Sequence, residues 1–207
     1  MAVAVESGRK LAVQILLPPL ADDVGRYNPR VFQSCLQDVV HGPGTHMNLL
    51  PVGELAPEFE LPAVVGGVKR KFRLGSQRGK RNVLLAFYPT NWSEVSRMQL
   101  TEFQEETEQL RARQTLAVSV CVDSIMNTTA WEREIGPLDF PMCSDFWPHG
   151  QVCTLFGGLR QQPPLRGAAD RMIYLIDRAG KILFRQAYGL EELPGLRAVL
   201  DVLGGLS

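Results

Sequence analysis

Short apolar runs alternate with amphipathic stretches over residues 51–207. The runs NVLLAFYP at 82–89, TLAVSVCVDS at 115–124 and FPMCSD at 140–145 have the length and the content of β-branched and aromatic residues that are typical of buried strands. Between the first two, residues 93–113 place apolar side chains near helical spacing among Glu and Gln, which predicts an amphipathic helix. This part of the chain therefore alternates strand and helix.

Hairpins and further helices complete the pattern. The segments FELP and VKRKFRL flank a Gly66-Gly67 turn, and RMIYLIDRAGKILFRQAY at 171–188 has its own turn at 178–181; both are typical of β-hairpins. Further helices are predicted at 128–136, near 148–158 and at 194–205. Alternating strands and helices followed by a hairpin and a helix predict an α/β fold of three layers around a central mixed sheet.

The first 50 residues show no comparable periodicity, and HGPGTHM at 41–47 is a Gly/Pro-rich break. Two interpretations fit. Either residues 1–50 are a flexible extension before a domain at 51–207, or translation starts naturally at Met47 and the upstream codons are read through. The apolar run LAVQILLPPLA at 11–21 is interrupted by Gln and Pro, so neither a membrane span nor export is expected. The chain is expected in the cytoplasm.

Composition and charge narrow the classes of function. Hydrophobic residues make up 45% and charged residues 21% of the 207 positions, as in ordinary soluble globular proteins. The 22 basic and 22 acidic side chains leave no net charge, so neither nucleic acid nor an anionic membrane is expected as a partner. The cysteines Cys35, Cys121, Cys143 and Cys153 match no zinc or CxxC spacing, and no metal or cofactor is expected. Their sparseness indicates a reducing compartment.

The stretch FYPTNWSEVSRMQL at 87–100 runs from a predicted strand into a helix start and holds no Cys, His, Asp or Lys. Ser96 and Gln99 have the S-x-x-Q spacing of a capping box, and Ser93 offers an earlier cap. A catalytic serine needs a nearby base, yet His149 is the only histidine in the predicted domain, and no Gly-x-Ser-x-Gly elbow surrounds Ser96. A capping role is therefore favoured over a hydrolytic one.

Several sequence blocks resemble those of the peroxiredoxins, the alkyl hydroperoxide reductase and thiol-specific antioxidant family. The resemblance covers residue 51 to about 203 and is closest to the branch with a SDFWPHG block. The matching blocks, in the family's order, are VGELAPEFELP, NVLLAFYP, VSVCVDS, FPMCSDFWPHG and DRMIYLID. The resemblance implies a thioredoxin-like, peroxiredoxin-type fold with an N-terminal β-hairpin added, and family members commonly form dimers.

In that family a Pro-x-x-x-Thr-x-x-Cys motif and a later Arg form the active site. The resemblance places the motif on Pro89, Ser93 and Ser96, and the Arg on Arg171. Serine thus stands at the position of the peroxide-reactive cysteine. In the family, a thiolate attacks the O–O bond of the hydroperoxide and becomes sulfenic acid. A serine hydroxyl titrates several pH units higher than a thiol, so the free energy of forming its anion leaves a deficit on the order of ten kcal/mol. Thiol peroxidase activity at Ser96 is therefore expected to be lost.

Two hypotheses about function remain. In the first, the protein is a binding or interaction module that holds a hydroperoxide or small anion between Ser96 and Arg171, at a helix N-terminus. In the second, it is an antioxidant thiol peroxidase that acts through Cys143 or Cys153. These cysteines are ten positions apart, and a disulfide between them would require Cα atoms within about 7 Å of each other.

Overall fold

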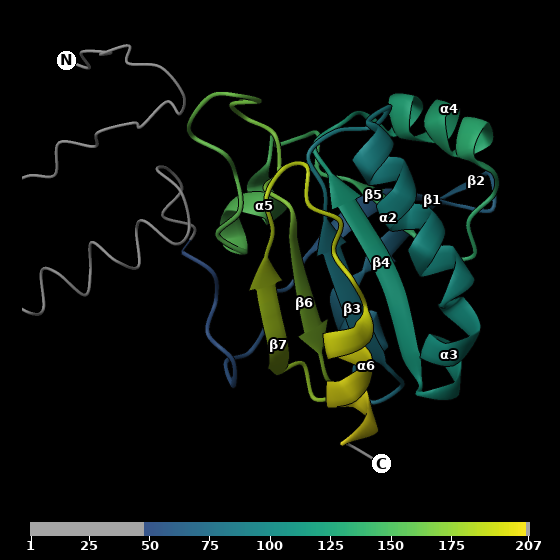
Figure 1. Cartoon of the computed structure of the whole chain (residues 1–207), viewed down its shortest axis with the longest axis vertical. Coiled ribbons are helices and arrows are strands. Elements are labelled where there is room, and N and C mark those ends of the chain that lie inside the picture. The colour runs from purple at the N-terminus through teal and green to yellow at the C-terminus, as the bar shows by residue number, and fades with distance from the viewer. Residues whose placement is uncertain (1–47, 206–207) are drawn as a thin grey trace, which may run out of the picture. The chain divides into compact units, whose positions relative to one another are not determined.

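One seven-stranded mixed sheet forms the centre of the fold (Figure 1). The computed structural model describes residues 48–205, so the expectations for residues 1–47 lie outside the described part. The strands run in the order β2-β1-β5-β4-β3-β6-β7. Their bounds are β1 Glu60–Val65, β2 Val68–Arg73, β3 Asn82–Phe87, β4 Thr115–Cys121, β5 Met142–Ser144, β6 Met172–Ile176 and β7 Ile182–Ala187.

The strand pairing confirms the predicted mixed sheet. β3, β4 and β5 are parallel neighbours, and β6 is antiparallel to β3. Both predicted hairpins are present: β1 pairs with β2 across Gly66 and Gly67, and β6 pairs with β7. The two turn glycines have φ values of 54° and 76°, in the left-handed region that glycine adopts without steric cost.

The helices differ from the predicted ones mainly at their ends. Their bounds are α2 Glu94–Glu105, α3 Thr107–Ala112, α4 Ile125–Ile135, α5 Gln151–Leu155 and α6 Arg197–Gly204, with a 3-10 helix, η1, at Leu74–Gln77. The single helix predicted at 93–113 is wrong, because it is broken at Glu106. There the Thr107 hydroxyl donates to the Phe103 carbonyl at 2.9 Å, a type of bond that bends helices. No helix in the described part is long and apolar enough to cross a bilayer.

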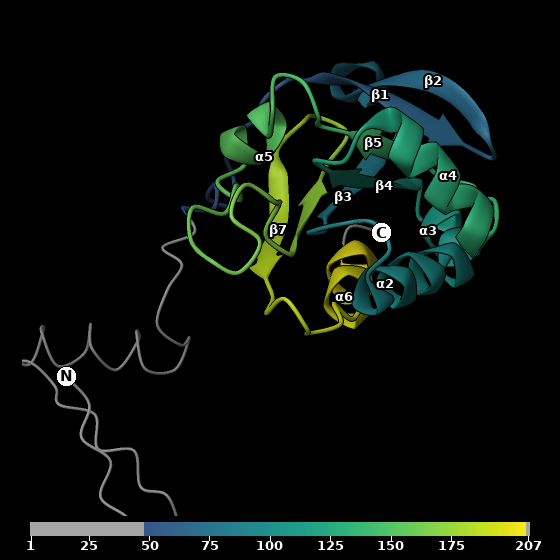
Figure 2. The same cartoon turned by 90° about the horizontal axis from the view of Figure 1, so that it is seen from above.

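Apolar side chains pack on both faces of the sheet, because successive side chains of β3 point to opposite faces. Leu85 and Phe87 belong to a core that α5 completes, whereas Leu84 and Ala86 belong to a core to which α2, α4 and α6 contribute. Figure 2 shows α2 and α6 on one side of the sheet and α5 on the other. The expected arrangement of three layers is confirmed.

The topology brings several connections to one edge of the sheet. Because β3, β4 and β5 are parallel, the segments that follow them, 88–93, 122–124 and 145–150, meet at their carboxyl ends. Arg171 reaches the same edge, since the residue after it is paired with Phe87 in the antiparallel strand β6. This edge therefore holds Pro89, Ser93 and Arg171, and Ser96 lies in the first turn of the helix that leads away from it.

Candidate functional site

Ser93 caps the helix that leads away from this edge. Its Oγ accepts a hydrogen bond from the Ser96 backbone N–H at 3.4 Å, and its backbone is extended, with φ −87° and ψ 137°. These are the features of an N-cap residue. The capping box expected from Ser96 and Gln99 is therefore wrong, because Ser96 is the third residue of α2 and already inside the helix. The earlier cap at Ser93 is confirmed.

The Ser96 side chain is fully buried in the first turn of α2, and its hydroxyl oxygen has no hydrogen-bond partner among the described residues. One turn further along, Gln99 is also fully buried, and its Nε2 has no acceptor there either. Residues three apart lie on the same helix face. A buried polar atom without a partner costs about 1–3 kcal/mol, so these two atoms mark a place suited to a bound polar group.

Arg171 contacts the same glutamine. Its Nη1 donates to Gln99 Oε1, while its Nε and Nη2 donate to the Leu190 carbonyl at 3.1 and 2.9 Å. The side chain is 1% exposed, and burial lowers the pKa of Arg171 from its ordinary value, with the charge of Glu191 acting in the opposite direction. A guanidinium keeps its proton in proteins, so a buried positive charge meets only neutral acceptors within hydrogen-bond distance in the described structure.

Gln99 is the residue that relates Ser96 to Arg171. No direct hydrogen bond joins the serine and the arginine within residues 48–205; both lie next to the glutamine. The sequence pattern indicates Gln99 only as part of a helix cap, although its three-residue spacing from Ser96 is a signal that the two share a helix face. The neighbouring charges Glu94 and Arg97 face solvent, where they approach each other to 3.6 Å.

The loop between β3 and α2 is anchored by Asn91, which no sequence pattern indicates. Asn91 is buried, its Oδ1 accepts from Tyr88 Oη at 2.9 Å, and its Nδ2 donates to Thr128 Oγ1 at 3.1 Å. Its backbone N–H donates to Asp123 Oδ2 at 2.8 Å. Pro89 is buried in the same loop. These bonds tie the loop to the segment after β4 and to α4, and so position the start of α2.

The three described cysteines are buried and unpaired. Burial raises the pKa of Cys121 to about 12, and it raises the pKa values of Cys143 and Cys153 well above that of an ordinary thiol. Reactive cysteines instead have lowered pKa values in partly exposed, electropositive surroundings. Cys143 and Cys153 belong to one apolar core and form no disulfide, so neither has the surroundings of an activated thiol.

The part of the chain that the structure describes brings neither a cluster of metal ligands nor a histidine to this site. Between residues 48 and 205, no group of three or more His, Cys, Asp or Glu side chains is placed to hold a metal ion. His149, the one histidine in that range, is exposed, and its Nε2 lies 2.8 Å from the Gly167 carbonyl oxygen. What the site offers is a helix N-terminus, a buried cation and unpartnered polar atoms.

The strand order and the helix layers define a thioredoxin-like α/β fold, and solved structures match it. The reduced 2-Cys peroxiredoxin of Plasmodium vivax aligns with a TM-score of 0.69 at 22% identity, over 75% of this chain and 81% of that one. AhpC of Mycobacterium tuberculosis aligns with a TM-score of 0.68 at 22% identity, over 76% of this chain and 93% of that one. The predicted fold class is confirmed.

Sequence comparison identifies the family. The pattern of the AhpC/TSA family matches residues 52–185, and the chain belongs to that family. Alkyl hydroperoxide reductase E of Mycobacterium tuberculosis is 29% identical over 159 residues, which cover 77% of this chain and 99% of the relative. Peroxiredoxin-2 of Bos taurus is 30% identical over 158 residues, which cover 73% of this chain and 75% of the relative. The family inferred from the sequence blocks is confirmed.

Proposed function

We propose that this family member has lost thiol peroxidase chemistry at Ser96 and acts as a binding module for a small anion or a hydroperoxide. The observation that carries the proposal is a fully buried serine in the first turn of α2, one helical turn before Gln99, which accepts a hydrogen bond from the buried Arg171. By the family resemblance, Ser96 stands where peroxiredoxins have their reactive cysteine. A hydroxyl there lacks the low pKa on which attack by a thiolate depends.

Three features favour an anionic ligand. The first turn of α2 presents the positive end of the helix dipole. Arg171 carries a buried charge whose hydrogen-bond acceptors, Gln99 Oε1 and the Leu190 carbonyl, are neutral. Ser96 Oγ and Gln99 Nε2 are buried without partners in the described structure, and each can donate a hydrogen bond. A small carboxylate such as formate carries the negative charge and the hydrogen-bond acceptors that these three features favour. Because Ser96 has no exposed surface, neighbouring side chains must move for the ligand to enter.

The competing hypothesis, a thiol peroxidase that acts through Cys143 or Cys153, has less support. Both side chains are fully buried, and burial raises the pKa of each thiol. The thiolate is the form that attacks peroxide, and it is scarce at neutral pH when the pKa is high. Hydrogen peroxide consumption by the Cys143→Ala/Cys153→Ala variant separates the two hypotheses, since only the enzyme hypothesis expects the variant to lose rapid turnover.

The peroxidase arm of the test uses hydrogen peroxide and an alkyl hydroperoxide, with thioredoxin or a small thiol as reductant. Wild-type protein is expected to consume peroxide no faster than ordinary exposed protein thiols. The Ser96→Ala variant is expected to give the same rate, because Ser96 performs no chemical step. Rapid turnover that Ser96→Ala abolishes would contradict the proposal.

The binding arm of the test is calorimetric titration of the full chain with sodium formate at constant ionic strength. Wild-type protein is expected to bind formate, and Gln99→Glu is expected to lose that binding, because the new carboxylate neutralises Arg171 from within. An exposed change of the same charge, Gln109→Glu on α3, is the matched control and should leave binding unchanged. Equal formate binding by all three proteins would exclude the Ser96 site.

The proposal extends to a homodimer in a reducing compartment such as the cytoplasm. The unpaired thiols of the described cysteines support the compartment, and a net charge of zero gives two copies little electrostatic repulsion. Light scattering on the full-length protein measures its mass in solution. A monomer at micromolar concentration would contradict the dimer.

A further inference from the structure

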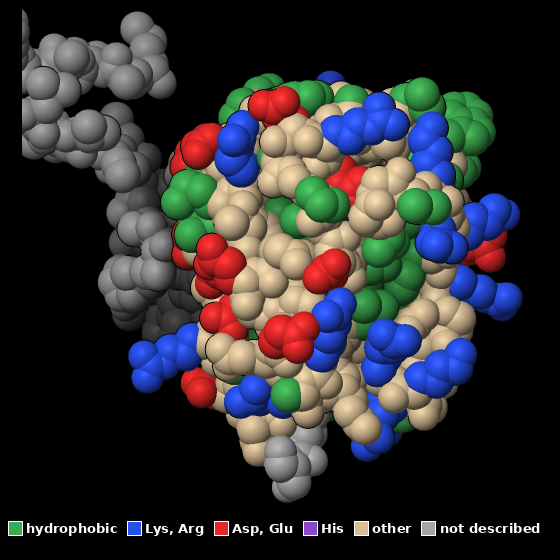
Figure 3. All heavy atoms as spheres, turned by 90° about the vertical axis from the view of Figure 1, so that its right-hand side faces the viewer, with side chains coloured by type: hydrophobic (Ala, Val, Ile, Leu, Met, Phe, Trp, Pro, Cys, Tyr) green, Lys and Arg blue, Asp and Glu red, His purple; other side chains and the backbone are tan. Residues whose placement is uncertain are grey.

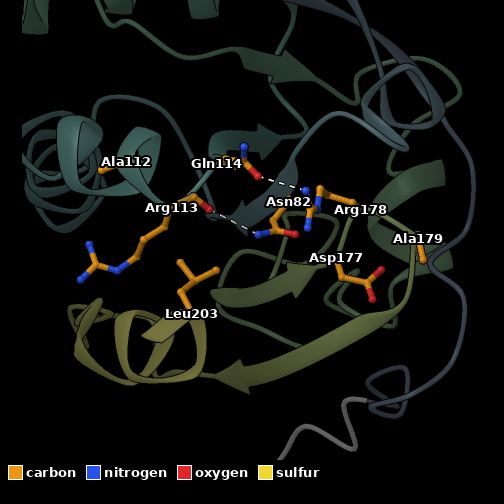
Figure 4. A pocket seen from close by; sticks show the side chains of 8 residues that line it. All are labelled: Asn82, Ala112, Arg113, Gln114, Asp177, Arg178, Ala179 and Leu203. Carbon is orange, nitrogen blue, oxygen red and sulfur yellow. Dashed lines mark hydrogen bonds between the residues drawn. The ribbon is translucent and has the colours of Figure 1, made fainter. Parts of the chain in front are cut away.

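A hollow of about 530 Å³ lies at the end of the sheet opposite to Ser96 (Figure 4). It is found where β3 and β4 begin and β6 ends, about 17 Å along β3 from the residues of the candidate site. Its volume falls in the range of small-molecule sites, roughly 300–1,000 Å³. The residues that line it are Asn82, Ala112, Arg113, Gln114, Asp177, Arg178, Ala179 and Leu203.

Positive charge collects at this hollow although the whole chain is neutral. Arg113 and Arg178 line it, and the exposed Arg81 precedes the lining residue Asn82. Within residues 48–205, Arg81 and Arg113 form no salt bridge, and Arg178 forms none either. Asp177 is the one acid among the lining residues, and its Oδ1 already accepts from a backbone N–H in its own turn, at 2.8 Å. Figure 3 shows Lys and Arg side chains along the lower part of one face of the molecule, with Asp and Glu side chains among them.

The two lining arginines keep most of their donors free. Arg178 Nη1 donates to Gln114 Oε1 at 3.0 Å, and Arg113 Nη1 donates to the Gln109 carbonyl at 3.2 Å. A guanidinium has five N–H donors, so Arg178 has donors left for a ligand. Figure 4 shows the Arg113 side chain extending away from Arg178, so Arg113 contributes its charge rather than a second direct contact. Because guanidinium geometry matches phosphate oxygens in pairs, the free donors favour a phosphate group.

Acceptors and an apolar wall lie between these cations. The Asn82 side chain is held by Nδ2, which is 3.5 Å from both the Arg113 carbonyl and Thr115 Oγ1, so its Oδ1 remains as an acceptor for a hydroxyl or amino group. Figure 4 shows the Asn82 amide between Arg178 and Leu203. Ala112 and Ala179, which are both exposed, supply apolar surface, and the mostly buried Leu203 adds little to it. The hollow thus combines phosphate donors, hydroxyl acceptors and an apolar wall.

We propose that this hollow is a second binding site, distinct from Ser96, for a nucleotide-like phosphomonoester. Its phosphate pairs with the free donors of Arg178 and is attracted by the charge of Arg113. Its sugar hydroxyls donate to Asn82 Oδ1 and the free oxygen of Asp177, and the face of its planar ring lies against the apolar part of the lining. No bond is made or broken in the ligand. The proposal is independent of what binds at the other end of the sheet.

Calorimetric titration of the full chain with AMP, adenosine and inorganic phosphate tests the proposal. AMP is expected to bind at least about tenfold more tightly than adenosine, because a charge-assisted pair is among the stronger polar contacts. It should also bind more tightly than phosphate, which lacks the hydroxyls and the ring. Arg178→Gln and Arg113→Gln should each weaken AMP binding severalfold. Arg70→Gln on β2 removes the same charge from an exposed position that does not line the hollow and should not.

Three results would overturn the proposal. AMP that binds no better than adenosine would show that no phosphate site exists. Phosphate that binds as tightly as AMP would indicate an adventitious ion only. If Arg70→Gln weakened AMP binding as much as Arg178→Gln, the effect would come from the overall charge of the protein and not from the hollow. Amide chemical shifts of the unmodified protein locate the ligand without any variant: AMP must perturb residues 112–114 and 177–179, and shifts confined to other segments would also contradict the site.

Discussion

The guanidinium of Arg171 donates a hydrogen bond to the amide oxygen of Gln99, 72 positions earlier in the chain. This contact joins the first part of α2 to the start of β6. Because the acceptor is neutral, the arginine charge is not balanced by it, and because only the amide oxygen is used, Gln99 Nε2 is left without a partner in the described structure.

Replacing Gln99 by Glu is expected to stabilise the fold at pH 7. A carboxylate here pairs with a cation that is already buried, and hydrogen bonds to charged groups contribute about 1.5–3 kcal/mol. The pairing lowers the folded-state pKa of the new carboxyl, so its stabilisation is present above the unfolded pKa and is lost as the pH falls through the folded value. Urea unfolding at pH 7 and pH 3 measures both effects. The exposed Gln109→Glu variant should show neither, and a destabilised Gln99→Glu protein at pH 7 would contradict the prediction.

Replacing Ser96 by Cys is expected to create a thiol unlike those of the described cysteines. A helix N-terminus and a nearby cation lower thiol pKa values to between about 3.5 and 7.5, whereas burial raises the pKa values of Cys121, Cys143 and Cys153. Thiolate absorbance near 240 nm follows the titration without requiring access by a reagent. Both the Ser96→Cys protein and its parent carry Cys35→Ser. The difference in their absorbance near 240 nm should show a titration midpoint below about pH 7.5.

The same titration with Arg171→Met separates the contribution of the arginine from that of the helix. Loss of the buried cation should move the pKa of the thiol introduced at position 96 upward. A thiol that titrates near the unperturbed value of about 8.5 in both backgrounds would mean that the site no longer favours a negative charge.

Replacing Asn91 by Ala is expected to destabilise the protein by about 2–4 kcal/mol. The change removes the acceptor for Tyr88 Oη and the donor to Thr128 Oγ1, so two buried groups lose their partners. Chemical denaturation measures the change in the free energy of unfolding. Thr101→Ala, on the exposed side of α2, is the control and should lie within about 0.5 kcal/mol of wild type. A similarly small effect at Asn91 would show that the loop is held in another way.

Asp145 is expected to give the stability an unusual dependence on pH. Its carboxylate accepts from the Val152 and Cys153 backbone N–H groups at 3.1 and 2.8 Å, yet burial is the larger influence and raises the pKa of Asp145. A carboxyl with a raised folded-state pKa binds protons more readily when folded. The stabilisation of the folded state by protonated Asp145 is therefore fully present below the pKa of the unfolded state, and it is lost as the pH rises through the pKa of the folded state.

The measurement compares wild type with Asp145→Asn by urea unfolding between pH 4 and pH 7. The variant is expected to be less stable throughout, because an amide cannot accept both backbone hydrogen bonds equally well, and the difference should narrow as the pH rises. Asp201→Asn, at an exposed position on α6, controls for the loss of a carboxyl group. A difference that widens with rising pH would contradict the raised pKa.

The sequence by itself determined the strands, the two hairpins, the family and the serine at position 96, because these depend on local periodicity and on blocks of neighbouring residues. It also contained the signal for a cap at Ser93. Local patterns could not show the helix break at Glu106, since a run of apolar residues at helical spacing reads the same with or without a bend. Local patterns also predicted a capping box at Ser96, because the spacing S-x-x-Q occurs inside helices as well as at their N-termini.

Only the tertiary structure decided which distant residues meet. The antiparallel pairing of β6 with β3 carries Arg171 to the first part of α2, where it contacts Gln99 rather than Ser96. The same sheet collects the buried cysteines in its interior and the arginines of three separate segments at its far end. The net charge of the chain is zero. The fold nevertheless places a buried cation at one end of the sheet and a basic hollow at the other, because strand pairing brings together residues that are far apart in the sequence.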